Sequence, residues 1–352
     1  MSVRNPAISA LMLVLGACSS PDLTPLEAGG GAIVAKEVSG ELPLDPDHSL
    51  WREAVPKEVA LYPQRSVEPY SGIDAKLPVR VRALHNGSAV ALRLEWEDAT
   101  AARERDIGTF ADAAAVQWPV EHGPGVGLPY IGMGDAGHPV ALWLWRADGT
   151  AEQLAAEGFG TLTAQPSQEV RANGAWRDGV WRVVLTRALA AGGEHAVELV
   201  PDRQGLVPLA LAVWSGEDAE RDGLKRLSAW RVLHLGGSEV DPAYVQELRD
   251  APLPSGDPER GRRLMAEKGC VACHAFPGNP AQPTTGPGLR YAGGIHRADY
   301  LSESLREPSE VIVPGKGFST AQDGRRTSLM PPFQGSAQER EDLVAYLKTL
   351  RR

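Results

Sequence analysis

The sequence of 352 residues has few of the features that mark disulfide-rich, membrane-spanning or nucleic-acid-binding proteins. Its three cysteines are too few for a disulfide scaffold. No apolar run reaches the roughly 18–20 residues that a helix needs to cross a bilayer. A net charge of −9 argues against binding of nucleic-acid phosphates. We find no motif for a nucleophile with its base, a phosphate loop or a zinc site, and therefore expect no catalytic site in this chain.

The composition favours two domains with many turns. The length fits two domains plus extensions. The 38 Gly and 28 Pro argue against a mainly helical protein, because both residues interrupt helices. Residues 254–352 carry 14 Lys or Arg and 11 Asp or Glu, whereas residues 1–253 carry 22 and 34. This asymmetry indicates either two units with different partners or ordinary variation in surface charge.

The N-terminus has the pattern of an export signal. Arg4 precedes a short apolar stretch over residues 7–15, which predicts a signal peptide at 1–17. The sequence Leu15-Gly16-Ala17-Cys18 resembles a bacterial lipobox, in which the cysteine receives lipid and becomes the mature N-terminus. The alternative is a plain signal peptide with an incidental Cys18. We expect residues 18–41 to be a flexible tether and the protein to be a lipid-anchored lipoprotein on the periplasmic side of a bacterial membrane.

The middle of the chain has the two-residue periodicity of β-strands. Apolar and charged residues alternate over residues 77–83 and 92–97, with Asn86-Gly87 as a turn between them. Asp178-Gly179 marks a second hairpin. Further strands are expected at Ala113–Trp118, Val140–Trp145, Val180–Thr186, Leu209–Trp214 and Leu227–Leu235. Short strands separated by turns predict a mainly β protein with an antiparallel β-sandwich over residues 42–238.

Several segments between about residues 42 and 235 resemble the haem-b-binding gamma subunits of periplasmic molybdoenzymes. This is the ethylbenzene dehydrogenase gamma-subunit family, shared by dimethyl sulfide dehydrogenase, selenate reductase and chlorate reductase. The matching segments follow one another in order: Asp47–Trp51, Glu95–Asp98, Asp112–Gln117, Gly132–Gly134, Val140–Trp145, Asp178–Trp181, Ala212–Gly216 and Glu220–Lys225. The resemblance implies a non-covalent haem b held in the sandwich.

In that family a methionine and a lysine hold the haem b iron. The resemblance places these ligands at Met133, which lies between two glycines, and at Lys225. A lysine amine binds iron only when deprotonated, and burial favours the neutral form. His138 and His234 are competing candidates, because histidine is a common haem ligand. We expect Arg221 and Arg226, which flank Lys225, to be solvated cations.

The C-terminal residues carry the most specific motif. After a linker predicted at residues 239–253, Cys270-Val271-Ala272-Cys273-His274 forms the C-x-x-C-H signature of covalent haem c attachment. The two thiols bind the haem covalently and His274 reaches the iron. A loop disulfide is the alternative, but it leaves the adjacent histidine unexplained. Export of the chain agrees with haem attachment outside the cytoplasm.

The flanks of this motif resemble a small class I cytochrome c over residues 254–352. We expect a helix from Pro258 to Gly269, capped by Asp257 or Ser255, and a C-terminal helix that starts at Ser336. The resemblance implies that the carbonyl of Pro287 orients His274. Met330 is predicted as the sixth iron ligand. The alternatives are Met265, His296 and an open coordination site.

These patterns together predict an exported two-haem electron-transfer protein. Its expected partners are the iron–sulfur subunit of a molybdoenzyme, a periplasmic redox carrier and, through the lipid, a membrane. The runner-up is a ligand-binding or carbohydrate-binding sandwich without haem b, in which the pairs Trp143/Trp145 and Trp176/Trp181 stack on a sugar. An enzyme with an open haem iron is a third class.

Overall fold

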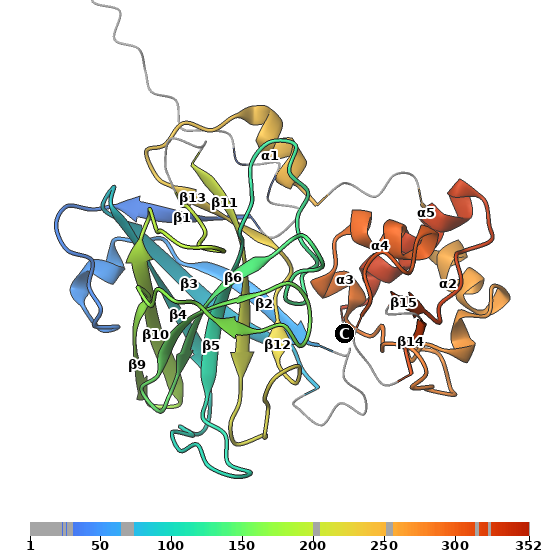
Figure 1. Cartoon of the computed structure of the whole chain (residues 1–352), viewed down its shortest axis with the longest axis horizontal. Helices are drawn as coiled ribbons and strands as arrows, with labels where there is room; N and C mark the ends of the chain where they lie inside the picture. Colours follow the sequence, from blue (N-terminus) through green and yellow to red (C-terminus); the bar gives the residue numbers. More distant parts are fainter. Residues whose placement is uncertain are drawn as a thin grey trace, which may run out of the picture.

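The computed structural model of the chain describes residues 23, 26, 31–64, 74–199, 205–250, 256–313, 317–322 and 325–351. An N-terminal β-sandwich is followed by a smaller, mostly helical unit, as Figure 1 shows, so the predicted fold class is confirmed. No helix within these ranges is long and apolar enough to span a membrane. The predicted signal peptide and Cys18 lie outside the described residues.

Thirteen strands of the sandwich form one continuous hydrogen-bonded sheet that folds into two layers. The pairing order is β8-β7-β6-β5-β11-β12-β2-β3-β4-β10-β9, while β1 pairs with β3 and β13, and β13 also pairs with β11. All pairs are antiparallel except those of β1. The strands are β1 (Ala32–Glu37), β2 (Lys57–Pro63), β3 (Leu77–His85), β4 (Ala89–Glu97), β5 (Ala113–Pro119), β6 (Val140–Arg146), β7 (Ala151–Ala156), β8 (Thr163–Ala164), β9 (Arg171–Arg177), β10 (Val180–Ala188), β11 (Leu206–Trp214), β12 (Arg226–Leu227) and β13 (Arg231–Leu235).

The two predicted hairpins are confirmed. Strands β3 and β4 are joined at Asn86-Gly87, where the Asn86 side chain accepts hydrogen bonds from the backbone of Ser88 and Ala89. Strands β9 and β10 are joined at Asp178-Gly179, and both turn residues have positive φ. Such left-handed turns match the twist of the paired strands, which is why short Asx-Gly sequences predict them well.

Tryptophan rings fill much of the core between the layers. Trp96, Trp145 and Trp181 pack together, with ring centroids 5.0 to 6.5 Å apart. Trp118 and Trp143 form a second pair at 4.9 Å. These five rings are buried, so Trp143, Trp145 and Trp181 are not available to stack on a sugar. This removes the feature on which the carbohydrate-binding alternative depended.

The strand predicted over Leu227–Leu235 is wrong as one element. It is divided into β12 and β13, which pair with different neighbours. Between them, the hydroxyl of Ser228 accepts a hydrogen bond from the backbone N–H of Leu211 and donates one to the carbonyl of Ala229. This local bonding breaks the ladder, and the apolar run of the sequence continues through the break.

Two segments that we expected to be irregular contain regular structure. The predicted tether at 18–41 includes β1, and the predicted linker at 239–253 includes helix α1 (Pro242–Leu248). Asp241 caps α1 and Pro242 is its first residue, so the Asp-Pro pair starts a helix rather than a linker. The buried side chains of α1 pack against the end of the sandwich: Tyr244, Val245 and Leu248 contact a cluster that includes Leu206 and Val232.

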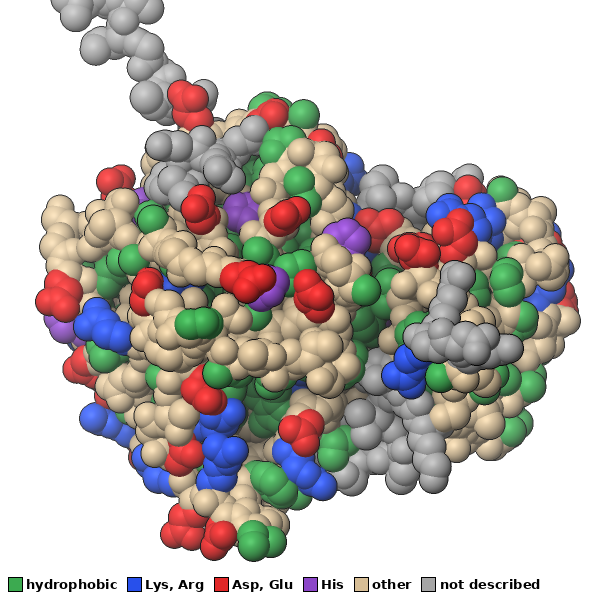
Figure 2. Space-filling view, in the orientation of Figure 1, with side chains coloured by type: hydrophobic (Ala, Val, Ile, Leu, Met, Phe, Trp, Pro, Cys, Tyr) green, Lys and Arg blue, Asp and Glu red, His purple; other side chains and the backbone are tan. Residues whose placement is uncertain are grey.

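The C-terminal unit is built around two crossing helices. Its elements are α2 (Pro258–Glu267), the short helix η3 (Cys270–Ala272), α3 (Ala292–Ile295), α4 (Ala298–Arg306), the hairpin β14 (Ser319–Gln322) and β15 (Arg325–Ser328), and α5 (Ala337–Thr349). Asp257 caps α2, and Ser336 with Glu339 forms a capping box at α5. Figure 2 shows acidic and basic side chains interspersed over both units.

Candidate haem sites

Helices α2 and α5 position the C-x-x-C-H motif. They cross at Gly261, where an added Cβ would lie 1.9 Å from the carbonyl oxygen of Asp342. Helix α2 ends before Gly269, which has a φ of +80°, and the chain then turns into η3. The glycines therefore bring Cys270 directly beside the packed helix pair.

The three residues of the motif have the chemistry that covalent haem attachment requires. Cys270 and Cys273 are free thiols. The His274 ring is oriented by a hydrogen bond of 2.9 Å between its Nδ1 and the carbonyl of Pro287, which leaves Nε2 free for a metal. Burial lowers the pKa of His274, so the imidazole is held in the neutral form that binds iron.

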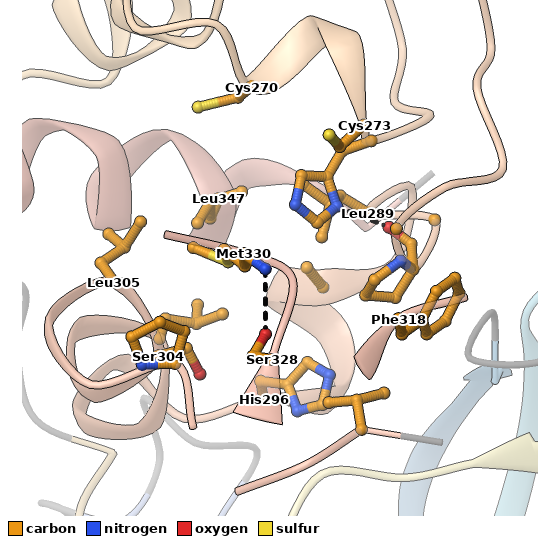
Figure 3. A pocket seen from close by; sticks show the side chains of 18 of the residues that line it. Cys270, Cys273, Leu289, His296, Ser304, Leu305, Phe318, Ser328, Met330 and Leu347 are labelled. Atoms are coloured by element: carbon orange, nitrogen blue, oxygen red, sulfur yellow. Dashed lines mark hydrogen bonds between the residues drawn. The ribbon is translucent and has the colours of Figure 1, made fainter. Parts of the chain in front are cut away.

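A cavity of about 380 Å³ opens beside the motif. Figure 3 shows Met330 pointing into this cavity, with Cys270 and Cys273 on one side and His296 on the opposite side. Gly286 forms part of the wall, and an added Cβ there would lie 2.9 Å from Cε1 of His274. The cavity walls are mostly apolar, as a haem macrocycle requires. The free thiols, the oriented imidazole and the cavity fit a haem c.

All three candidate sixth ligands line this cavity: Met330, Met265 and His296. Met330 lies in the loop after β15, where its backbone N–H donates to the Ser328 hydroxyl at 3.1 Å. Met265 is a core residue of α2 and is 2% exposed. Burial lowers the pKa of His296 to about 3, so its ring is neutral.

His296 belongs to an aromatic stack that joins the two units. Its ring lies 5.8 Å from the ring of Tyr130 in the sandwich, at an interplanar angle of 15°. Tyr300 of α4 completes the group, 4.8 Å from His296 and 5.1 Å from Tyr130. Sequence analysis did not find this contact, because no local pattern shows that Tyr130 reaches the cytochrome unit.

A second cluster of apolar side chains lies on the outer face of the sheet formed by β5, β6, β7 and β11. Small side chains form the floor of this face on two adjacent strands: Ala113, Ala115, Ala210 and Ala212. Leu142, Leu144 and Leu154 adjoin them on β6 and β7. This is an unusual use of an outer sheet face, since such faces commonly carry polar residues. These small side chains are buried in a cluster that also contains Tyr130, Ile131 and Met133.

The predicted ligand Met133 belongs to this outer apolar cluster. Its backbone has a φ of +75°, a conformation that residues other than glycine rarely adopt. Neighbours hold the turn in place: Gly134 N–H donates to the carbonyl of Tyr130 at 2.9 Å, and Gly158 N–H donates to the carbonyl of Met133 at 2.7 Å. An added Cβ at Gly134 would lie 2.7 Å from a carbonyl oxygen, so this glycine is required. Such constrained conformations often occur at functional sites.

The predicted ligand Lys225 is 3% exposed. Its Nζ lies 5.1 Å from the ring centroid of Trp214, which packs against the same outer cluster as Met133. No carboxylate among the described residues forms an ion pair with it. Burial lowers the pKa of the Lys225 ammonium to about 8, against an opposing effect of Asp222. A buried amine without an ion pair, beside a tryptophan that packs against the same cluster as Met133, has the chemistry of a haem b iron ligand.

The competing histidines are engaged elsewhere. The exposed His138 ring bonds to the carboxylate of Asp135 at 2.5 Å, and this bond raises the pKa of His138. His234 lies on β13 and its Nε2 is 3.4 Å from the carbonyl of Ser238. The expectation for Arg226 is wrong, because it is buried and its guanidinium lies 3.4 Å from Glu220. Arg221 is exposed as expected.

The two sites share a wall. Tyr130, Ile131 and Gly132 line the cavity beside Cys270 and Cys273, and the next residue in the chain is Met133. Gly132 is confined, because an added Cβ would lie 2.5 Å from the Tyr130 ring and 2.9 Å from that of Phe159. The segment from Tyr130 to Met133 therefore contacts one candidate haem site with its first residues and the other with its last.

Comparisons with known proteins agree with this division of the chain. A sequence model described as ethylbenzene dehydrogenase matches residues 48–168 and 164–226. A cytochrome c model matches residues 258–351. A solved carbohydrate-binding module of family 9 from Caldicellulosiruptor kristjanssonii covers 60% of this chain and 98% of its own, at 7% identity. Its TM-score of 0.34 is too low to bear on function.

Three relatives are similar over most of their own length. The ORF7 protein of Haloferax mediterranei, named as a proposed heme subunit of a respiratory nitrate reductase, is 31% identical over 70% of this chain and 88% of its own. The chlorate reductase gamma subunit of Ideonella dechloratans is 34% identical over 54% and 79%. The dimethylsulfide dehydrogenase gamma subunit of Rhodovulum sulfidophilum is 32% identical over 53% and 72%. The chain therefore belongs to the ethylbenzene dehydrogenase family of gamma-type subunits and carries a cytochrome c domain at its C-terminal end.

Proposed function

We propose that this protein is a two-haem electron relay, the gamma-like subunit of a molybdoenzyme. In this proposal Cys270 and Cys273 attach haem c, with His274 and Met330 as its axial ligands. Met133 and Lys225 hold a non-covalent haem b on the outer face of the sandwich. Haem groups supply reversible one-electron chemistry, and the chain's own residues fix the positions of the two sites.

The single observation that carries the proposal is the shared wall. Because Tyr130, Ile131 and Gly132 line the haem c cavity and Met133 follows directly, only a few covalent bonds separate the two candidate sites. The stack of Tyr130 on His296 adds a direct contact between the domains. This arrangement gives a short, water-poor route for electrons from one site to the other.

The partners follow from the relatives. A gamma subunit is by name one part of an assembly, so we infer that a second subunit delivers or receives electrons at the sandwich. The iron–sulfur subunit of a molybdoenzyme is the partner proposed there, and a periplasmic redox carrier is the partner proposed at the cytochrome domain. Lipid at Cys18 would keep this relay at the periplasmic side of a membrane.

Intramolecular electron transfer tests the relay. A radiolytic pulse delivers less than one electron per molecule to the oxidised full chain, and absorbance at the two haem α bands is followed with time. We expect a first-order exchange between the two bands whose rate does not change with protein concentration. An exchange rate proportional to protein concentration would show that electrons pass between molecules, and the relay would be wrong.

A further inference from the structure

A second cavity lies where the sandwich meets the cytochrome domain. Its volume is about 200 Å³, and helix α3 separates it from the haem c cavity. Gly293 and Gly294 of α3 line the smaller cavity, whereas Ala292 and Ile295 line the larger one. Among the described residues, four cationic side chains and one acidic side chain line the smaller cavity: Arg231, Arg297, Lys348 and Arg351 against Asp250.

Two of the four cations are neutralised by carboxylates. Lys348 Nζ donates to Asp250 Oδ2 at 2.7 Å and to the carbonyl of His296 at 2.8 Å. Arg297 pairs with Asp299 at 2.9 Å and also donates to the carbonyl of Leu248. The positive charges of Lys348 and Arg297 are therefore each balanced by a carboxylate.

Arg231 and Arg351 have no such balance. Nε of Arg231 is inaccessible to solvent and has no acceptor among the described residues. Arg351 donates through Nε to the carbonyls of Gly293 and Lys348, both at 3.1 Å, and forms no ion pair with a described carboxylate. Burial and the positive charge of Arg351 lower the pKa of Arg231, whereas Tyr62 and Asp250 act in the opposite direction. Two guanidinium groups thus line one cavity, and neither forms an ion pair with a carboxylate of the described residues.

We propose that this cavity binds a doubly charged oxyanion of the phosphate class between Arg231 and Arg351. Guanidinium groups present forked N–H donors that match the oxygens of such an anion. Two negative charges offset the repulsion between the two cations, and an anion oxygen supplies the acceptor that the buried Nε of Arg231 lacks. The cavity has room for a small oxyanion rather than for a large organic ligand.

The consequence of binding is a bridge between the domains. Arg231 belongs to strand β13 of the sandwich, and Arg351 follows helix α5 of the cytochrome domain. Without an anion these like charges repel one another across the junction. A bound oxyanion turns this repulsion into attraction and so stabilises the arrangement in which Tyr130 stacks on His296. None of the described residues that line this cavity lines the haem c cavity, and anion binding does not require haem b to be present.

Calorimetric titration of the full haem-loaded chain with inorganic phosphate tests the site, with sodium chloride of equal ionic strength as the reference. We expect one saturable site, and a higher thermal unfolding midpoint in phosphate than in chloride. Arg231→Gln and Arg351→Gln should each weaken phosphate binding at least about tenfold, since each removes a charged fork. Arg263→Gln, on an exposed part of α2, is the matched control and should bind phosphate like the unchanged protein.

Two results would overturn the proposal. One is the absence of saturable phosphate binding, and the other is binding of unchanged strength in both Gln variants. The haem c spectrum reports folding of each variant, because neither arginine lines the haem c cavity. If Arg231→Gln does not fold, Arg351→Gln decides the question alone, since Arg351 is exposed at the end of α5 and its loss leaves no cavity in the core.

Discussion

At the scale of single residues, the environment of Lys225 is unusual for a lysine. It is buried beside Trp214, and its amine has no carboxylate partner among the described residues. A structural lysine would normally extend its charge to water or pair it. The cost of keeping this amine buried is explained if a haem b iron binds it in the neutral form.

Replacement of Lys225 by leucine should separate function from stability. We expect Lys225→Leu to lose haem b and to retain covalent haem c. Compared with the unchanged protein without haem b, the variant should have a free energy of unfolding that is higher by about 3 kcal/mol near pH 7. The reason is that the folded chain holds Lys225 at a pKa of about 8, well below the usual 10.5, so its charge destabilises the fold. Haem content and chemical denaturation measure the two effects.

The sign of the pH dependence provides a second readout of the same variant. Between pH 8 and 10.5 the unfolded chain binds more protons at Lys225 than the folded chain does, so stability of the haem-b-free protein should rise with pH in this window. Lys225→Leu should lose this rise, whereas the exposed control Arg221→Ala should keep it. If Lys225→Leu binds haem b with an unaltered spectrum, the ligand assignment is wrong and His138 or His234 is next to be tested.

Met330 is the proposed sixth ligand of the haem c iron. Met330→Ala should abolish the weak near-infrared sulfur-to-iron band and lower the haem c reduction potential, because loss of the thioether disfavours reduced iron. Near-infrared spectra and a redox titration check this. Met265→Leu is the control, since it keeps the α2 core while removing the other sulfur. If the band persists in Met330→Ala and vanishes in Met265→Leu, the sixth ligand is Met265.

At the scale of elements, the crossing of α2 and α5 depends on one glycine. An added Cβ at Gly261 would lie 1.9 Å from the backbone oxygen of Asp342, and backbone atoms cannot rotate away as a side chain would. We expect Gly261→Val to separate the helices, to lower the unfolding free energy by about 3 kcal/mol or more and to reduce covalent haem incorporation.

Ala266→Val serves as the control for that substitution. Ala266 lies on the exposed face of the same helix, so valine adds similar bulk without meeting α5. Calorimetric unfolding and the haem c absorbance per polypeptide distinguish the two variants. Equal stability of Gly261→Val and Ala266→Val would show that the crossing tolerates separation and that the contact is not essential.

The same elements show what the sequence could predict. Hairpins with Asn86-Gly87 and Asp178-Gly179, and helix starts at Asp257 and Ser336, are set by residues close together in the chain, so they were predictable. The break at Ser228 depends on a bond to Leu211 from another strand, and no local pattern shows it. Helix α1 is short, and its burial against the sandwich, rather than its propensity, stabilises it.

In the two candidate haem sites, too, only the features set by residues close together in the chain were predictable from local sequence. The C-x-x-C-H motif lies within five residues, so the sequence located it directly. Met133 and Lys225 are far apart in the chain and were placed only through a family resemblance. The stack of Tyr130 on His296 and the pair Arg231 and Arg351 arise from the docking of two domains, which the sequence of either domain does not encode locally.

At the scale of the whole molecule, the sequence Leu15-Gly16-Ala17-Cys18 predicts that the protein is anchored to a membrane by lipid. If Cys18 receives lipid, Cys18→Ser should stall processing or release the protein in soluble form, since a membrane anchor of several acyl chains is lost. Fractionation of cells into membrane and soluble pools measures this. Unchanged membrane association of Cys18→Ser would contradict the lipoprotein prediction.

The proposed relay requires that one chain carries two haems of different attachment. Acid–acetone extraction of the purified full chain, followed by reduced-minus-oxidised spectra of the extract and of the residual protein, tests it most directly. We expect one extractable haem b for each haem that stays covalently bound through Cys270 and Cys273. A protein whose haem is entirely covalent, with no b-type band before extraction, would contradict the two-haem relay.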